Sequence, residues 1–191
     1  GDGVRMKKLI EDFNTEHINH FSARSLENLA AASGLVMRSG AQTTIESTAD
    51  VPYPAVWQIW GSPADEAPEI AFDTELRPEL ERYVGASKQM MDAFAERIVS
   101  AVDRPVAVWG AGQLTNKLLA ETALGDAQIV AFVDGNAVFH GTRLKGVPIA
   151  GPEAIGSPDI PIVIASTIHQ AAITRRVRED LNLGNPLITL A

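Results

Sequence analysis

The sequence predicts an α/β protein whose C-terminal part is a parallel sheet covered by helices. From residue 106 onward, short apolar stretches alternate with helical ones, and the stretch 160–165 is apolar almost throughout. Strands of that kind are typical of parallel sheets buried on both faces, joined by right-handed crossovers. The first 61 residues contain only one helical pattern and two or three strand patterns. We therefore expect them to form a partial α/β segment, the tail of a larger domain.

The composition describes an ordinary globular protein and excludes several classes. The chain has 191 residues, 46% of them hydrophobic, and a formal net charge of −8. That charge disfavours nucleic acid, which requires clustered Lys and Arg. No apolar run approaches the roughly 20 residues that cross a membrane. The absence of Cys favours the cytoplasm, and the four His lack the spacing of a zinc site, so we expect no metal.

Capping signals define a helix in the N-terminal part, residues 1–61. Ser22 suits an N-cap, and Gly34 suits the left-handed position after the last turn, with Leu35 as the apolar contact beyond it. Strands are expected at 35–37, 43–45 and 56–60.

Residues 62–77, with their prolines and acids, are predicted to form a linker, and residues 78–191 a second domain. The second domain is expected to open with a long helix that starts near Pro78. Its apolar stripe comprises Leu80, Val84, Met91, Phe94, Ile98 and Val102.

The remaining elements of the second domain follow from its alternating pattern. We expect strands at 106–109, 129–133, 147–149, 160–165 and 187–190, and helices at 113–122, at 152–155 and after Ser166 and Thr167, which can cap the last helix.

A glycine turn, Gly110-Ala-Gly112, joins the first of these strands to its helix. With Asp134 at the end of the next strand, the layout is that of a dinucleotide-binding βαβ unit. Thr115 stands where the third glycine of that fingerprint would be. The turn therefore either holds a phosphate at the helix N-terminus or only permits a tight bend.

The carboxyl ends of parallel strands meet at one edge of a sheet, where ligands bind. The residues expected to gather there, as candidates for substrate or nucleotide binding, are Gly110, Gly112, Asp134, Asn136, Ser166, Thr167 and His169.

A second candidate site is the pair Glu16-His17. Histidine suits proton transfer near neutral pH and an adjacent acid can assist it, although both residues could equally secure a loop before the helix. The basic run 175–178 is followed at once by two acids, so a solvated helix face explains it better than a binding patch.

The segment from Glu16-His17 through Phe21-Ser22 to Gly34 resembles the closing part of S-adenosylmethionine-dependent methyltransferases, best of all the sugar C-methyltransferases. In that family a Rossmann-like C-terminal domain follows. Val133-Asp134, Asn136, the run from Gly141 to Pro148-Ile149, and Pro152-Glu153 resemble its motifs. The resemblance covers most of residues 13–191.

The resemblance implies a transferase that methylates a nucleotide-linked or polymer-linked sugar, held between two domains. It makes His17 the candidate base, with Glu16 in support. The methyl donor, S-adenosylmethionine, would bind outside this chain, so we expect the 191 residues alone to be inactive. Two alternatives stay open: a stand-alone module that binds NAD(P) or a nucleotide sugar, and a structural module that holds a homodimer or a partner enzyme.

Overall fold

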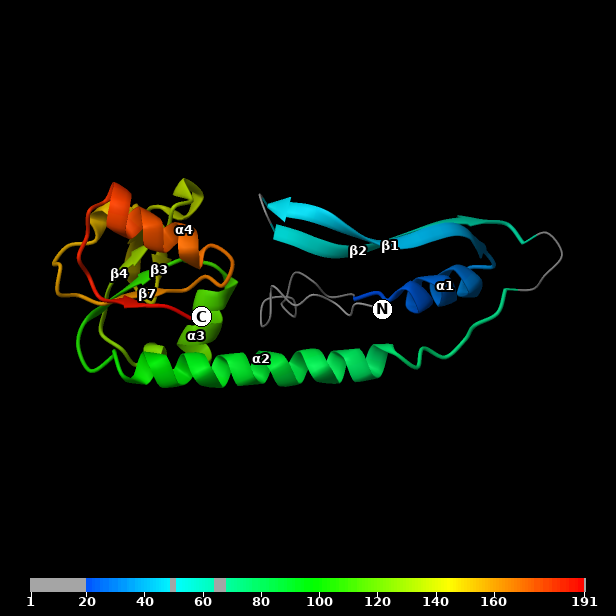
Figure 1. Ribbon diagram of the computed structural model, residues 1–191, viewed down its shortest axis with the longest axis horizontal. Helices are drawn as coiled ribbons and strands as arrows, with labels where there is room; N and C mark the ends of the chain where they lie inside the picture. The colour runs from blue at the N-terminus through cyan, green and yellow to red at the C-terminus, as the bar shows by residue number, and fades with distance from the viewer. Residues whose placement is uncertain (1–19, 49–50, 64–67, 191) are drawn as a thin grey trace. The chain divides into compact units, whose positions relative to one another are not determined.

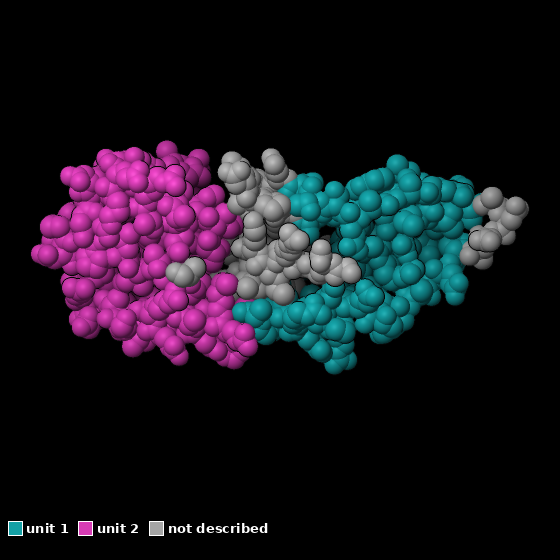
Figure 2. Space-filling view, in the orientation of Figure 1, with its two compact units in different colours: residues 1–86 teal, residues 87–191 magenta. Residues whose placement is uncertain are grey.

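A computed structural model describes residues 20–48, 51–63 and 68–190 of the chain. The protein consists of two compact units, residues 1–86 and 87–191 (Figure 2). The division falls inside the long helix α2 (Leu76–Val99), which contributes its first turns to unit 1 and the rest to unit 2.

The described part of unit 1 opens with helix α1 (Ala23–Ala32), whose two ends are capped as the sequence predicts. The Ser22 hydroxyl accepts the backbone N–H of Ser25 at 2.9 Å, and the Ser25 hydroxyl is within 2.7 Å of the Ser22 N–H. At the other end Gly34 has a φ of 72°. The Leu35 N–H donates to the Ala30 carbonyl at 2.8 Å, which is the bond of a Schellman motif that spans the larger number of residues.

A long antiparallel hairpin follows, made of β1 (Val36–Thr48) and β2 (Val51–Gly61). The prediction of two separate strands at 35–37 and 43–45 is wrong, because β1 runs through both. Gly40 lies within the strand, between the two predicted segments. A Cβ there would stand 2.8 Å from the Trp57 carbonyl oxygen, so the close approach of β2 explains this glycine.

Helix α1 contacts one face of the hairpin and leaves the other without cover in the described residues. On the contacted face, the Gln58 side chain donates to the Ala23 carbonyl at 2.8 Å. On the opposite face, Trp57 and Ile59 from β2 join Ile45 from β1, and about half of each side chain is exposed. A two-stranded hairpin is only marginally stable by itself in water, so this apolar face calls for a covering layer.

Helix α2 starts at Leu76, two residues before the predicted start, and Pro78 lies in its first turn, where proline is tolerated. Met91, Phe94 and Ile98 are buried as predicted, whereas Val84 is 58% exposed. The predicted stripe was wrong at this position. The buried row continues instead through Tyr83, one residue and about 100° away around the helix.

Asp73 joins the N-terminal ends of α1 and α2. Its Oδ1 accepts the backbone N–H groups of Glu75 at 3.0 Å and Leu76 at 2.9 Å, and its Oδ2 accepts the Ser22 hydroxyl. The Ser22 bond is the main cause that holds the pKa of Asp73 below 3.8; the two N–H groups and the Arg24 charge act in the same direction, against partial burial.

Acidification is therefore expected to weaken unit 1 through Asp73. Because the folded pKa is the lower one, the contribution is complete above pH 3.8 and is lost as the pH falls through the folded value. Asp73→Asn should lower the free energy of unfolding by about 1 kcal/mol at neutral pH and flatten its acid dependence. Hydrogen exchange of α1 across this pH range measures both effects. Asp92→Asn, in an exposed pair with Lys88, is the control, and an equal response of both variants would contradict the assignment.

Unit 2 contains a mostly parallel six-stranded sheet in the order β5-β6-β4-β3-β7-β8, which confirms the predicted α/β class. The strands are β3 (Val106–Trp109), β4 (Ile129–Val133), β5 (Arg143–Leu144), β6 (Val147–Ala150), β7 (Ile162–Ile164) and β8 (Leu187–Ile188). The short edge strand β5 pairs antiparallel with β6, an exception that the sequence pattern did not predict.

Helices flank both faces of this sheet (Figure 1). One face carries α4 (Gln170–Arg175), which continues as a π-helical turn, η4 (Arg176–Asp180); the other carries α3 (Gln113–Glu121) and the C-terminal half of α2. Three 3₁₀ turns complete the unit: η1 (Ala123–Gly125), η2 (Ala137–Phe139) and η3 (Pro152–Ala154). Alternate residues of β3 point to opposite faces of the sheet. Ala107 and Trp109 lie on the face that carries η4, where they belong to the same buried cluster as Val177. Within the described part of the chain, no helix has the length and apolarity needed to span a membrane.

Candidate functional site

The loops that follow β3, β4 and β7 meet at the carboxyl edge of the sheet. The Gly110 N–H donates to the Val133 carbonyl at the end of β4, and the Ala165 N–H after β7 donates to the Trp109 carbonyl, each at 2.8 Å. The chain runs from β3 outward to β4 and β6, then crosses to the other side of β3 for β7 and β8. The strand order thus reverses between β3 and β7, and such a point is the usual place for a ligand crevice.

The two glycines of the turn have different roles. Gly110 has a φ of +112°, and a Cβ there would lie 2.9 Å from the Ala165 carbonyl oxygen, so the fold itself requires glycine. Gly112 is the N-cap of α3 with a φ of −87°. A Cβ at Gly112 would meet nothing within 4 Å. The N-terminus of α3 therefore opens onto unfilled space.

Thr115 explains why the third glycine of the fingerprint is dispensable here. Its side chain is fully buried, and its hydroxyl donates to the Gly110 carbonyl at 2.7 Å. The hydroxyl ties the first turn of α3 back to the glycine turn and satisfies a carbonyl that the bend leaves without a strand partner.

Asp134 holds the glycine turn from the neighbouring strand. Its Oδ2 accepts the Ala111 N–H at 2.8 Å and its Oδ1 accepts the Asn136 N–H at 2.7 Å. The Asn136 side chain in turn accepts the Val138 N–H at 3.1 Å and caps η2. The structure therefore brings Gly110, Asp134 and Asn136 together, with both carboxylate oxygens of the acid already engaged by backbone donors.

Ser166, Thr167 and His169 follow β7, one strand away from the glycine turn. The prediction that Ser166 or Thr167 caps the next helix is wrong, because α4 starts at Gln170 and its N-cap is His169. Ser166 instead accepts the His169 N–H at 3.0 Å and closes a turn ahead of the helix. That turn takes up the residues between the strand and α4, and the His169 side chain is exposed.

Arg176 belongs to this edge of the sheet, although the sequence pattern suggested only a solvated helix face. Its guanidinium lies 6.0 Å from the ring centroid of Trp109. One guanidinium nitrogen is 3.3 Å from where a Cβ of Gly135 would stand, so the absence of a side chain at Gly135 leaves room for the arginine. Trp109 is the last residue of β3, and Gly135 follows the adjacent strand β4. The link between these two residues and Arg176 can be recognised only once the helix is placed over the sheet.

The neighbouring arginines differ from Arg176. Arg178 donates to the carbonyls of Leu183 at 2.6 Å and Asn185 at 2.8 Å, and so anchors the loop that leads to β8. Arg175 is exposed at the end of α4. Arg176 is thus the cation of this run that lies against the strand ends.

Glu16 and His17, the candidate catalytic pair, lie outside the described residues. In the part of the chain that the structure does describe, no three His, Cys, Asp or Glu side chains form a group that could hold a metal ion.

Comparison with known families gives one match. The family model described as C2185-like, N-terminal, matches residues 102–185, from just before β3 to beyond η4. This segment, which contains the glycine turn, Asp134 and Arg176, is similar to that family. The comparisons with curated proteins and with solved structures gave no match.

Proposed function

We propose that this chain is the C-terminal portion of an S-adenosylmethionine-dependent methyltransferase acting on a nucleotide-linked or polymer-linked sugar. Unit 2 would be its Rossmann-like domain and would supply part of the substrate pocket. The strand order of the five parallel strands supports the Rossmann-like assignment, because the first strand lies in the centre and the sheet grows outward on both sides.

The observation that carries the substrate assignment is the position of the Arg176 guanidinium. It lies against Trp109 at the end of β3 and beside Gly135 just after β4, while the N-terminus of α3 opens above Gly112. An exposed guanidinium and the positive end of a helix dipole both favour a phosphate group. The carboxylate of Asp134 accepts the backbone N–H groups of Ala111 and Asn136 and so orders the glycine turn. Both of its oxygens are therefore engaged, and neither is free to accept a ribose hydroxyl. A sugar phosphate fits this arrangement better than a dinucleotide.

Unit 1 supports the methyltransferase part of the proposal. Its hairpin presents an apolar face, with Trp57 and Ile59 exposed by about half, that a larger α/β domain would cover. The capped start of α1 at Ser22 follows directly on the segment of Glu16 and His17, in which His17 would remove a proton from carbon and Glu16 would support it.

Calorimetric titration tests the substrate assignment. The full chain is titrated with UDP-glucose, dTDP-glucose and GDP-mannose, with NAD and NADP, and with glucose alone. We expect at least one nucleotide sugar to bind and free glucose to be silent. Arg176→Gln should weaken that binding roughly 10- to 100-fold, the cost of losing a charge-assisted hydrogen bond. Arg175→Gln, one residue earlier on an exposed position, is the matched control and should bind as the wild type does.

Two results would contradict this assignment. Binding of NAD or NADP alone would favour the stand-alone dinucleotide module, and an Arg176→Gln affinity equal to that of the control would remove the arginine from the site. Silence towards every ligand would favour a purely structural module. Asp134→Ala is a poorer test, because it would also release the Ala111 N–H and disturb the turn.

A further inference from the structure

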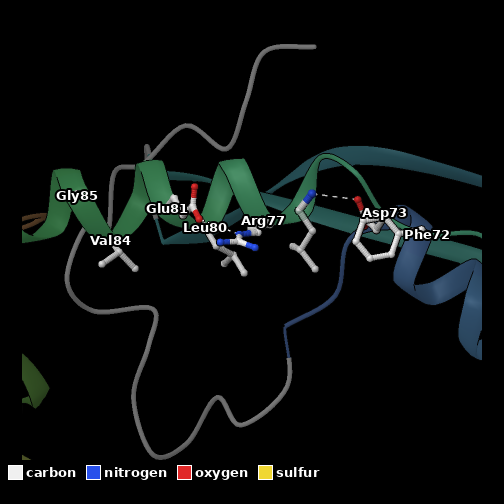
Figure 3. Close-up of a pocket in the computed structure, with 8 residues that line it drawn as sticks. Phe72, Asp73, Arg77, Leu80, Glu81, Val84 and Gly85 are labelled. Carbon is white, nitrogen blue, oxygen red and sulfur yellow. Dashed lines mark hydrogen bonds and ion pairs between the residues drawn. The ribbon is translucent and has the colours of Figure 1, made fainter.

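The N-terminal half of α2 carries an apolar groove on the surface of unit 1. Leu76, Leu80 and Val84 recur every four residues along the helix and line the groove together with Phe72. Figure 3 labels Phe72, Leu80 and Val84. Phe72 is 87% exposed and Val84 58% exposed. The groove has a volume of about 670 Å³. An exposed apolar ridge of this kind on a surface helix marks an interaction site.

Gly85 leaves the end of this ridge without a side chain. Glycine inside a helix costs about 1 kcal/mol relative to alanine. A Cβ at Gly85 would meet nothing within 4 Å, so packing within the protein does not require glycine here. The missing side chain leaves room beside Val84 for a side chain of a second helix.

The charges beside the ridge indicate which partner fits. Arg77 and Glu81 lie one turn apart on α2, form an ion pair at 2.9 Å, and are 85% and 64% exposed. Two copies of this helix in parallel would place like charges together. In antiparallel alignment, Arg77 of each copy faces Glu81 of the other, and a twofold axis closes the assembly.

The same antiparallel register also fits the apolar side chains. When position 77 lies opposite position 81, Leu80 of one copy enters the space between Leu76 and Leu80 of the other, as ridges pack into grooves. Apolar packing and charge pairing are therefore satisfied by one arrangement.

We propose that the protein forms a homodimer through the N-terminal half of α2, with two copies of the ridge Leu76, Leu80 and Val84 packed antiparallel about a twofold axis. This interface is separate from the proposed ligand site at the carboxyl edge of the unit 2 sheet. The dimer proposal therefore does not depend on which substrate binds at that site.

Sedimentation equilibrium of the full chain tests the proposal. The wild type should show about twice the monomer mass of 20.4 kDa. Leu80→Asp should raise the dimer dissociation constant at least ~100-fold, as expected for a charge at the centre of an apolar interface. Val138→Asp, at a residue 80% exposed on η2 of unit 2, is the control and should leave the dimer intact.

Charge reversal gives a second test, which distinguishes pairing between two chains from the Arg77–Glu81 ion pair within one chain. Arg77→Glu alone and Glu81→Arg alone should each weaken self-association roughly tenfold, because like charges then face each other. An equimolar mixture of the two variants should recover the dimer, since each chain now offers the charge that the other lacks.

A monomeric wild type would overturn the proposal and would mean that something other than a second copy occupies the groove. A dimer that neither Leu80→Asp nor charge reversal weakens would also overturn it, and would favour assembly through another surface such as the apolar face of the hairpin.

Discussion

Phe132→Ala is expected to lower the free energy of unfolding of unit 2 by about 4 kcal/mol. Phe132 is fully buried on β4, where it lies between Val108 of β3 and Ile149 of β6 in the register of the sheet. Removing its ring loses apolar burial and leaves a cavity that the flanking strands, fixed by their ladder hydrogen bonds, can fill only in part. A loss of this size approaches the lower end of the roughly 5–15 kcal/mol by which native domains are stable.

The measurement must separate the two units, because a protein with two compact units can unfold in more than one transition. Hydrogen exchange of β3, β4 and β7 reports the stability of unit 2 alone. Val130→Ala, on the same strand but 43% exposed, is the matched control and should cost less than about 1 kcal/mol. Equal protection in the two variants would show that the sheet does not depend on this ring.

The elements that could be predicted are those whose signals are local. Ser22 and Gly34 bracket α1 because an N-cap hydroxyl and a left-handed residue act within a turn of the helix. β3 and β7 are apolar runs because both faces of a parallel sheet are covered there, so their burial can be read from composition alone. The carboxyl edge follows from the parallel order, and with it the meeting of Gly110, Asp134 and Asn136.

The features that could not be predicted depend on contacts between distant residues. β1 continues through Gly40 because β2 approaches closely at that point. The sequence near Gly40 does not indicate this approach, since the contacting residue, Trp57, is distant along the chain. The bond from Thr115 to the Gly110 carbonyl requires the turn geometry before it can be recognised. Arg176 reaches the strand ends from the π-helical turn that continues α4, a local departure from α-helical geometry that the sequence pattern does not show.

Gly110→Ala is expected to destabilise unit 2 by about 3 kcal/mol, through two effects that act at the same atom. An alanine would have to keep a φ near +112°, and its Cβ would stand 2.9 Å from the Ala165 carbonyl oxygen. That oxygen belongs to the backbone, so no side chain can move aside to relieve the contact. Hydrogen exchange of β3 and β7 measures the loss.

Gly112→Ala separates the needs of the fold from those of a ligand. Its φ of −87° suits any residue, and the added methyl would enter empty space. Stability should change by less than about 1 kcal/mol. If a phosphate lies against the N-terminus of α3, that methyl occupies part of the same space and nucleotide-sugar affinity should fall while the fold stays intact. Loss of affinity in Gly110→Ala alone would instead trace the effect to the stability of the turn, and the open space above Gly112 would then have no part in binding.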